Sequence, residues 1–108
     1  MNAGDDKMLV MFSMAPFGKG ESLSEYVSES IKLVEKSGLN HQVTPMGTII
    51  EGEWDEIFNL INKCRMAMRK KANRISIKIW VDDRKGVKNA LKKKIQSLEN
   101  RMGHELSK

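Results

Sequence analysis

Met8-Leu9-Val10-Met11-Phe12-Ser13-Met14-Ala15 is a nearly unbroken apolar run with the length of one strand. A strand that is apolar at successive positions is buried on both faces, whereas a strand with one solvated face alternates apolar and polar residues. The run therefore predicts a strand at the centre of a sheet. Pro16 to Gly20 follows it with residues typical of turns, which end the strand.

The rest of the sheet is predicted from three further segments. Arg74 to Asp82 alternates most cleanly and predicts a strand with one apolar and one mixed face. His41 to Thr44 and Thr48 to Glu51 are shorter β-rich segments on either side of the turn Pro45-Met46-Gly47. On the last strand, the apolar face carries Ile75, Ile77, Ile79 and Val81, and the mixed face carries Ser76, Lys78, Trp80 and Asp82.

Three segments repeat apolar residues every three or four positions, which predicts amphipathic helices. Ser22 and Glu25 form a capping box at the start of the first helix, and Gly38 supplies its left-handed end. Acidic residues from Glu53 to Glu56 mark the first turn of the second. The predicted buried stripes are Leu23, Tyr26, Val27, Ile31 and Val34; Trp54, Ile57, Phe58, Ile61, Cys64 and Met68; and Val87, Leu91, Ile95, Leu98 and Met102.

The predicted order of elements is βαββαβ followed by one more helix. With right-handed crossovers, this order gives a four-stranded antiparallel sheet with two helices on one face. The fold class is thus α+β, a ferredoxin-like βαββαβ sandwich with an additional C-terminal helix, in a single domain over residues 8–102. We expect residues 1–7 to be a disordered leader or tag remnant, with Met8 as the natural start or the first ordered residue, and residues 103–108 to be a frayed tail.

The second face of such a sheet is left uncovered by the two crossover helices. Lys78 and Trp80 stand on that face, so the third helix, a second subunit or a ligand must cover it. We expect the protein to associate with itself through sheet faces and edges, as homodimers or as homotetramers built from two dimers. Lys78 and Trp80 are the predicted interface residues, and ligand stacking on Trp80 is the less favoured reading.

Several classes of function find no support in the sequence. It has no hydrolase, phosphate-loop or zinc-protease motif, which favours a protein that is not an enzyme. The neighbours of Cys64 on its predicted helix are apolar, so we interpret it as a core residue. The two histidines of the chain are far from it in the sequence, so we expect no metal and no cofactor. No apolar run approaches the roughly 18 residues of a membrane span, so we expect a cytoplasmic protein with no membrane partner.

Nucleic-acid binding is the least favoured of the binding hypotheses. The formal net charge of +5 suits a polyanion. The basic runs at 69–71 and 92–94, however, fit the end of one helix and the solvent side of another. The predicted central strands also lack the aromatic pattern with which RNA-recognition domains stack bases.

Small polar residues near the ends of apolar strands form a candidate ligand site. Ser13 lies near the end of the first strand, and Thr48 and Glu51 lie on the strand after the turn. If these strands are neighbours, the two hydroxyls approach each other and line a pocket, to which Glu51 adds a charge that favours a cation or amine. Each residue also has an ordinary alternative: a satisfied buried hydroxyl for Ser13, a strand residue for Thr48, and a helix cap or salt-bridge partner for Glu51.

Three segments resemble a known family, the small thiamine-binding (YkoF-like) proteins. They are Phe12-Ser13-Met14-Ala15-Pro16-Phe17-Gly18, Ser37-Gly38-Leu39 and Pro45-Met46-Gly47-Thr48-Ile49-Ile50-Glu51-Gly52-Glu53-Trp54-Asp55-Glu56. The resemblance covers Met8 to about Ile95, and its most specific part is Gly-Thr-x-x-Glu-Gly before a helix. Phe17, where the family pattern has an aliphatic residue, and the lysine-rich last helix depart from it and leave the identity of the ligand open.

The resemblance implies a ferredoxin-like domain that assembles through its sheets into dimers and tetramers. It also implies binding of thiamine, or of its hydroxymethylpyrimidine part, without chemical change. The family's binding positions carry over to Ser13 and Thr48 and, less securely, to Glu51: hydroxyls can read an aminopyrimidine and a carboxylate can meet the cationic thiazolium. The alternative is an oligomeric interaction module with no small-molecule role.

Overall fold

The computed structural model describes residues 7–18, 23–85 and 90–102, with the side chains of residues 90–93 left out of the description. The elements follow the predicted order, a βαββαβ unit and one more helix, which confirms the ferredoxin-like α+β fold. They are β1 (Met8–Pro16), α1 (Leu23–Ser37), β2 (Asn40–Thr44), β3 (Gly47–Gly52), α2 (Trp54–Arg69), β4 (Ile75–Asp82) and α3 (Ala90–Met102).

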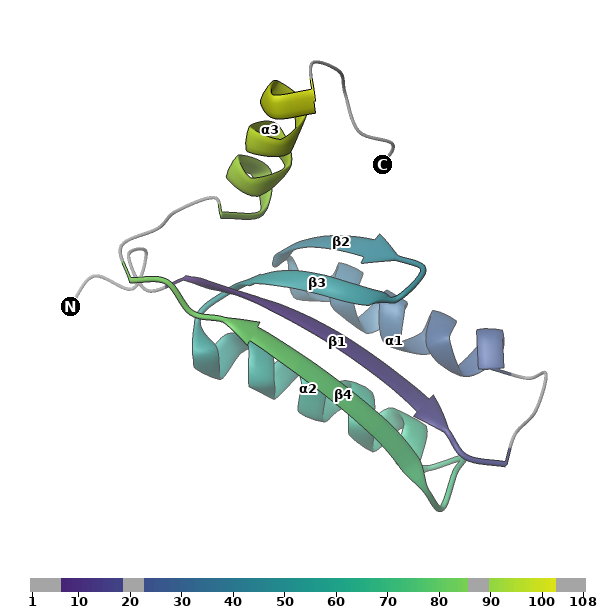
Figure 1. Ribbon diagram of the computed structural model, residues 1–108. Helices are drawn as coiled ribbons and strands as arrows, with labels where there is room; N and C mark the ends of the chain where they lie inside the picture. Colours follow the sequence, from purple (N-terminus) through teal and green to yellow (C-terminus); the bar gives the residue numbers. More distant parts are fainter. Residues whose placement is uncertain (1–6, 19–22, 86–89, 103–108) are drawn as a thin grey trace.

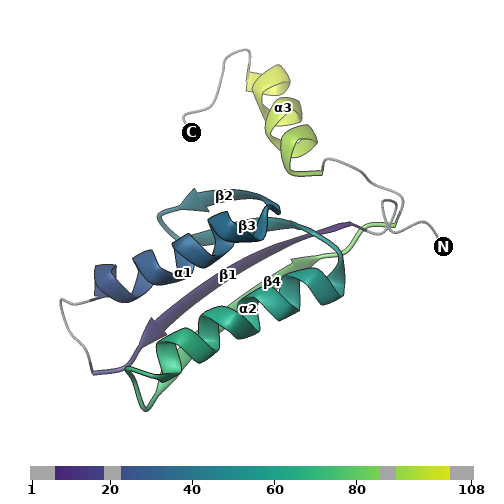
Figure 2. The ribbon, with the colours of Figure 1, turned by 180° about the vertical axis from the view of Figure 1, so that it is seen from behind.

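The four strands form one sheet in the order β2-β3-β1-β4, and every neighbouring pair is antiparallel. The apolar run of β1 thus lies between two partners, as its composition predicts. Helices α1 and α2 lie side by side on one face of the sheet, and α3 stands apart from both (Figures 1 and 2). We call the face that α1 and α2 cover the helix face and the opposite one the open face.

The core lies between the helix face and the two helices. Alternation along β1 turns four of its side chains toward the helices, where all are buried: Met8, Val10, Phe12 and Met14. They pack with Val34, Ile50, Ile57, Leu60, Ile61, Cys64 and Met68. The prediction that Cys64 is a core residue is confirmed, because its side chain is fully buried and its Sγ contacts the Ser30 carbonyl oxygen at 3.8 Å. Burial raises the pKa of this thiol.

The helix ends follow from local chemistry. Glu53 and Glu56 form a reciprocal capping box at the start of α2, and Gly38 ends α1 with φ of +76°. The predicted cap Ser22, the stripe residues Val87 and Leu91, and the leader and tail at 1–6 and 103–108 fall outside what the structure describes.

Five predicted stripe residues are exposed rather than buried: Leu23, Val27, Trp54, Leu98 and Met102. Leu23 and Trp54 begin their helices and are largely exposed, because the first turn of each helix projects past the core. The Trp54 ring packs on Phe58 instead, with 4.4 Å between the ring centroids. Leu60 takes part in the core although the predicted stripe omits it.

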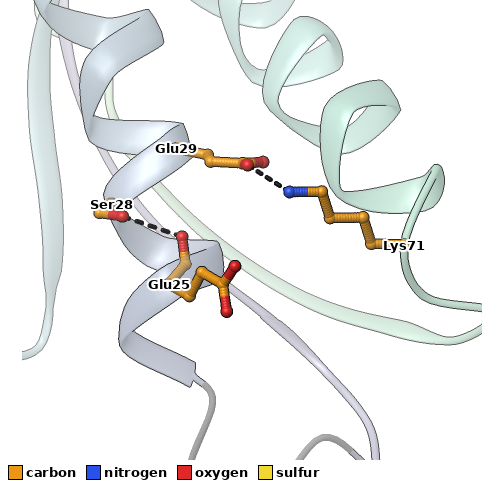
Figure 3. Close-up of polar contacts among 4 residues, drawn as sticks. All are labelled: Glu25, Ser28, Glu29 and Lys71. Atoms are coloured by element: carbon orange, nitrogen blue, oxygen red, sulfur yellow. Dashed lines mark hydrogen bonds and ion pairs between the residues drawn. The ribbon is translucent and has the colours of Figure 1, made fainter.

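An ion pair joins the two covering helices at one end. Lys71, just after α2, pairs with Glu29 of α1, and the hydroxyl of Ser28 donates to the Glu25 carbonyl oxygen at 2.9 Å (Figure 3). The Glu29 carboxylate raises the pKa of the Lys71 ammonium, although this pair is largely solvated. Across the described ranges, no helix has both the length and the apolar character needed to span a membrane.

Candidate functional site

The candidate site lies where the β2–β3 hairpin stops short of the end of β1. β1 has nine residues and β3 has six, and their pairing ends at Phe12 and Thr48. From Ser13 to Pro16, β1 pairs only with β4. One edge of β1 is therefore without a strand partner beyond the hairpin. We call residues 13–16 on this side the free edge.

The turn of the hairpin is held tightly against β1. The Thr44 hydroxyl donates to the Gly47 carbonyl oxygen at 2.7 Å and accepts from the backbone N–H groups of Met46 and Gly47, each at 3.2 Å. Gly47 itself lies so close to β1 that a Cβ there would be 2.9 Å from the Phe12 carbonyl oxygen. Only glycine allows this approach, so the hairpin ends at a defined place on β1.

A hollow of about 130 Å³ lies between α1, the hairpin end and the free edge. We call it the edge hollow. An apolar cavity of about 150 Å³ binds benzene, so this volume suits one six-membered ring. Its lining is Phe12, Ser13, Met14, Val27, Ser30, Ile31, Val43, Thr44, Pro45, Met46, Gly47 and Thr48. The structure thus brings Ser13 and Thr48 to one hollow, since β1 and β3 are neighbours as predicted.

The two hydroxyls do not face each other, contrary to the sequence-based expectation. Thr48 is opposite Phe12, so its side chain lies on the helix face, where it is 8% exposed. Ser13 is opposite Lys78 and belongs to the open face. Side chains alternate along a strand, so a residue next to Phe12 must turn away from the face that Phe12 occupies. Ser13 reaches the hollow by its position at the free edge.

Ser30 is a lining residue that the sequence reading missed. It lies on α1, is 8% exposed and lines the edge hollow with Thr48. Its position was marked in the sequence, because it is three residues after Val27 and four before Val34, on the apolar stripe. A small hydroxyl residue on such a stripe is a signal for a polar group inside the fold.

Glu51 does not line the edge hollow, so its charge is not placed beside Thr48 as the sequence suggested. It is opposite Leu9 and Asn40, on the open face, and three residues of strand place it about 10 Å from Thr48. Its side chain is buried and accepts a hydrogen bond from the Asn40 amide at 3.2 Å. Phe17 also lies outside this lining, with the Arg74 guanidinium 4.4 Å above its ring.

The open face carries two larger hollows. Lys78 and Trp80 lie on it as predicted, and the Trp80 side chain is 71% exposed. One hollow, of about 460 Å³, is lined by Met11, Ser13, Pro45, Met46, Lys78, Ile79 and Trp80. The other, of about 510 Å³, lies under α3 and is lined by Leu9, Met11, Gln42, Ile49, Trp80, Asp82, Lys94, Ile95 and Leu98.

Helix α3 is tied to the sheet by charge. The Lys94 ammonium of α3 donates to the Asp82 carboxylate of β4, and this contact lowers the pKa of Asp82. Among the residues that the structure describes, no group of three or more His, Cys, Asp or Glu side chains could hold a metal ion.

Comparison with known proteins gives a consistent match. The sequence profile described as thiamine-binding protein matches residues 10–99. A UPF0045 protein of Mycobacterium bovis is 40% identical over 93 residues, which are 85% of this chain and 91% of that protein. A UPF0045 protein of Methanocaldococcus jannaschii is 29% identical over 92 residues, which are 85% of this chain and 92% of that protein.

Two solved structures have the same fold. A hypothetical protein of Methanocaldococcus jannaschii superposes with a TM-score of 0.80 at 29% identity, covering 86% of this chain and 96% of its own. A Thermotoga maritima protein, provisionally described as a thiamine biosynthesis/salvage protein, superposes with a TM-score of 0.74 at 22% identity. That match covers 85% of this chain and 98% of the other, and at this identity it shows the fold alone.

Proposed function

Since this chain belongs to the thiamine-binding protein family, we propose that it binds thiamine, or its hydroxymethylpyrimidine part, in the edge hollow. The observation that carries the proposal is the size and lining of this hollow: about 130 Å³, with the buried hydroxyl residues Thr48 and Ser30 on its wall. Thiamine has two rings, and this volume suits one. The aminopyrimidine enters the hollow, and the thiazolium stays outside.

The chemistry of the lining suits a neutral heteroaromatic ring. Phe12, Val27 and Ile31 supply apolar contact for the ring faces, and the hydroxyls of Ser30 and Thr48 offer groups that both donate and accept hydrogen bonds. This mixture of apolar walls with a few polar groups is typical of small-molecule sites.

Binding without chemical change is the second part of the proposal. None of the described residues that line the edge hollow carries a titratable side chain. General acid or base catalysis requires such a group within hydrogen-bond reach of the ligand. The protein therefore holds the vitamin rather than transforming it, and we place this role in the cytoplasm.

Isothermal titration calorimetry with thiamine and with hydroxymethylpyrimidine tests the proposal. We expect both to bind, and we expect Thr48→Val and Ser30→Ala each to weaken binding up to about tenfold through loss of a hydrogen bond. Ser97→Ala, on the exposed surface of α3, is the matched control and should bind like the wild type. Absence of heat for both ligands at millimolar concentration would refute the proposal.

Self-association through the open face is a separate proposal about partners. Its support is the exposure of Trp80 on the open face, where it lines one hollow together with Met11 and the exposed Met46. Trp80→Ala should shift the sedimentation coefficient toward the monomer and leave thiamine affinity unchanged, because Trp80 does not line the edge hollow. A variant with wild-type sedimentation would show that this face is not the interface.

A further inference from the structure

The free edge of β1 carries backbone N–H and C=O groups, which can bind a ligand in addition to the side chains that line the edge hollow. In a strand, the N–H and C=O of one residue point to one neighbouring strand, and those of the next residue point to the other. The side on which each residue of β1 directs these groups can therefore be read from two fixed points. Figure 1 shows β1 and β4 continuing past the turn that joins β2 and β3.

Two contacts of β1, one on each side, agree on the direction in which each residue points its backbone groups. Phe17 N–H donates to the Arg74 carbonyl oxygen at 2.9 Å, so odd-numbered residues here direct their groups to the β4 side. The Phe12 carbonyl oxygen lies against Gly47, where a Cβ would be 2.9 Å away, so even-numbered residues direct theirs to the β3 side. Met14 is even-numbered, and its N–H and C=O thus point to the β3 side.

At Met14 that side has no strand. The pairing of β1 with β3 ends at Phe12, and the turn residue that would be opposite Met14 is Met46, which is 79% exposed. No hydrogen bond joins the backbone of Met14 to the turn within the described part of the chain. Met14 is nevertheless buried and lines the edge hollow. Buried backbone groups are nearly always hydrogen-bonded in folded proteins, so the N–H and C=O of Met14 are positioned to bond a ligand in the hollow.

Pro16 makes Met14 the sole N–H donor of the free edge. The residues of this edge that point to the β3 side are Met14 and Pro16, and proline has no N–H. The free edge therefore presents one donor, the Met14 N–H, and two acceptors, the carbonyl oxygens of Met14 and Pro16. A proline on an unpaired edge also discourages another strand from adding there.

We propose that the backbone N–H and C=O of Met14 bind the ligand as a strand would, by pairing with adjacent acceptor and donor groups on one edge of its ring. This inference rests on the proposed function and names the ligand's class: a planar ring with a nitrogen acceptor beside an exocyclic amine. The aminopyrimidine of thiamine has that edge. Its ring nitrogen accepts from Met14 N–H, and its amine donates to Met14 C=O.

The same geometry discriminates against a ring with an oxo group in place of the amine. In that ring the nitrogen is a donor and the oxygen an acceptor, so the two groups are reversed relative to Met14. Turning the ring over would restore the two hydrogen bonds. It would, however, point the substituent that carries the thiazolium the opposite way along β1. We therefore expect the 4-oxo analogue of thiamine to bind at least tenfold more weakly.

Nuclear magnetic resonance of the full-length protein tests the inference directly. With 15N-labelled protein and ligand labelled at the ring nitrogen, we expect a 15N–15N coupling across a hydrogen bond from the Met14 amide. Met14→Leu conserves the side-chain volume and should retain the coupling, because the coupling depends on the backbone of residue 14. Leu60→Met, the reverse exchange at a core residue outside the lining, controls for repacking.

The outcomes separate this inference from the proposed function. A coupling at Met14, together with weak binding of the oxo analogue, supports both. Thiamine binding with no coupling and no change at the Met14 amide would overturn the inference and leave the proposed function standing. If neither thiamine nor hydroxymethylpyrimidine binds, the proposed function fails and the inference fails with it.

Discussion

Gly47→Ala is the substitution whose effect the structure specifies most closely. An alanine Cβ at this position would be 2.9 Å from the Phe12 carbonyl oxygen and 3.2 Å from the Met11 Cγ. The first of these neighbours is backbone in the central strand, so it cannot move without shifting β1. The hairpin end must move away instead, which opens the contact that closes one side of the edge hollow.

The expected cost is that of overpacking a rigid site, about 2 kcal/mol in the free energy of unfolding. For a domain of this size, that corresponds to a fall of about 10 °C in Tm. Since Gly47 also lines the edge hollow, thiamine affinity should fall with stability. Urea unfolding followed by circular dichroism measures the first quantity, and calorimetry measures the second.

Gly52→Ala, at the other end of β3, is the matched control. A Cβ there would meet the side-chain tips of Ile57 at 3.3 Å and Leu39 at 3.4 Å, and such groups can adjust. Because Gly→Ala also restricts the unfolded chain, the net change should stay within about 1 kcal/mol of zero. Equal stability of the two variants would refute the argument that the Phe12 backbone excludes a side chain at Gly47.

Three further outcomes are expected. Acid should weaken the contact of α3 with the sheet, because the lowered pKa of Asp82 means that its pairing with Lys94 is present at neutral pH and is lost as the pH falls below about 4. The effect should be small because the pair is largely solvated, so hydrogen exchange of α3 amides should rise slightly in acid, and Asp82→Asn should remove this rise. Cys64 should resist thiol reagents until the protein unfolds, because burial raises its pKa, and a thiol titration faster than unfolding would contradict this. Glu51→Ala should lower the free energy of unfolding in urea by about 1–3 kcal/mol, because the Asn40 amide loses its hydrogen bond to the Glu51 carboxylate. A change of more than threefold in thiamine affinity would contradict the finding that Glu51 lies outside the edge hollow.

Much of the architecture could be predicted from local pattern. The apolar run of β1, the alternation of β4 and the left-handed end at Gly38 each depend on neighbours a few residues away, and the structure has all three. The adjacency of β1 and β3 follows from the order of elements and the handedness of crossovers. The exposure of Trp54 was not predictable in this way, because periodicity does not show how far a helix projects past its sheet.

The candidate site was only partly predictable. The order of elements places Ser13 and Thr48 on neighbouring strands, but their assignment to faces requires the pairing of Phe12 with Thr48. A shift of one residue in that pairing would exchange the two faces. Closeness in sequence groups Glu51 with them. The apolar stripe of its helix marks Ser30, but sequence alone does not position that helix beside the hollow.

The sequence by itself determined the helices and strands of this protein and the central place of β1 in the sheet. It also determined that Thr48 is a polar residue on the strand that follows the turn. Those properties arise from residue periodicity and turn chemistry, which act over a few positions. Only the tertiary structure decided that the hairpin ends at Phe12 and leaves the backbone of Met14 facing a hollow under α1. Where β3 stops relative to β1 depends on the contact between Gly47 and the Phe12 carbonyl oxygen, which joins residues 35 positions apart.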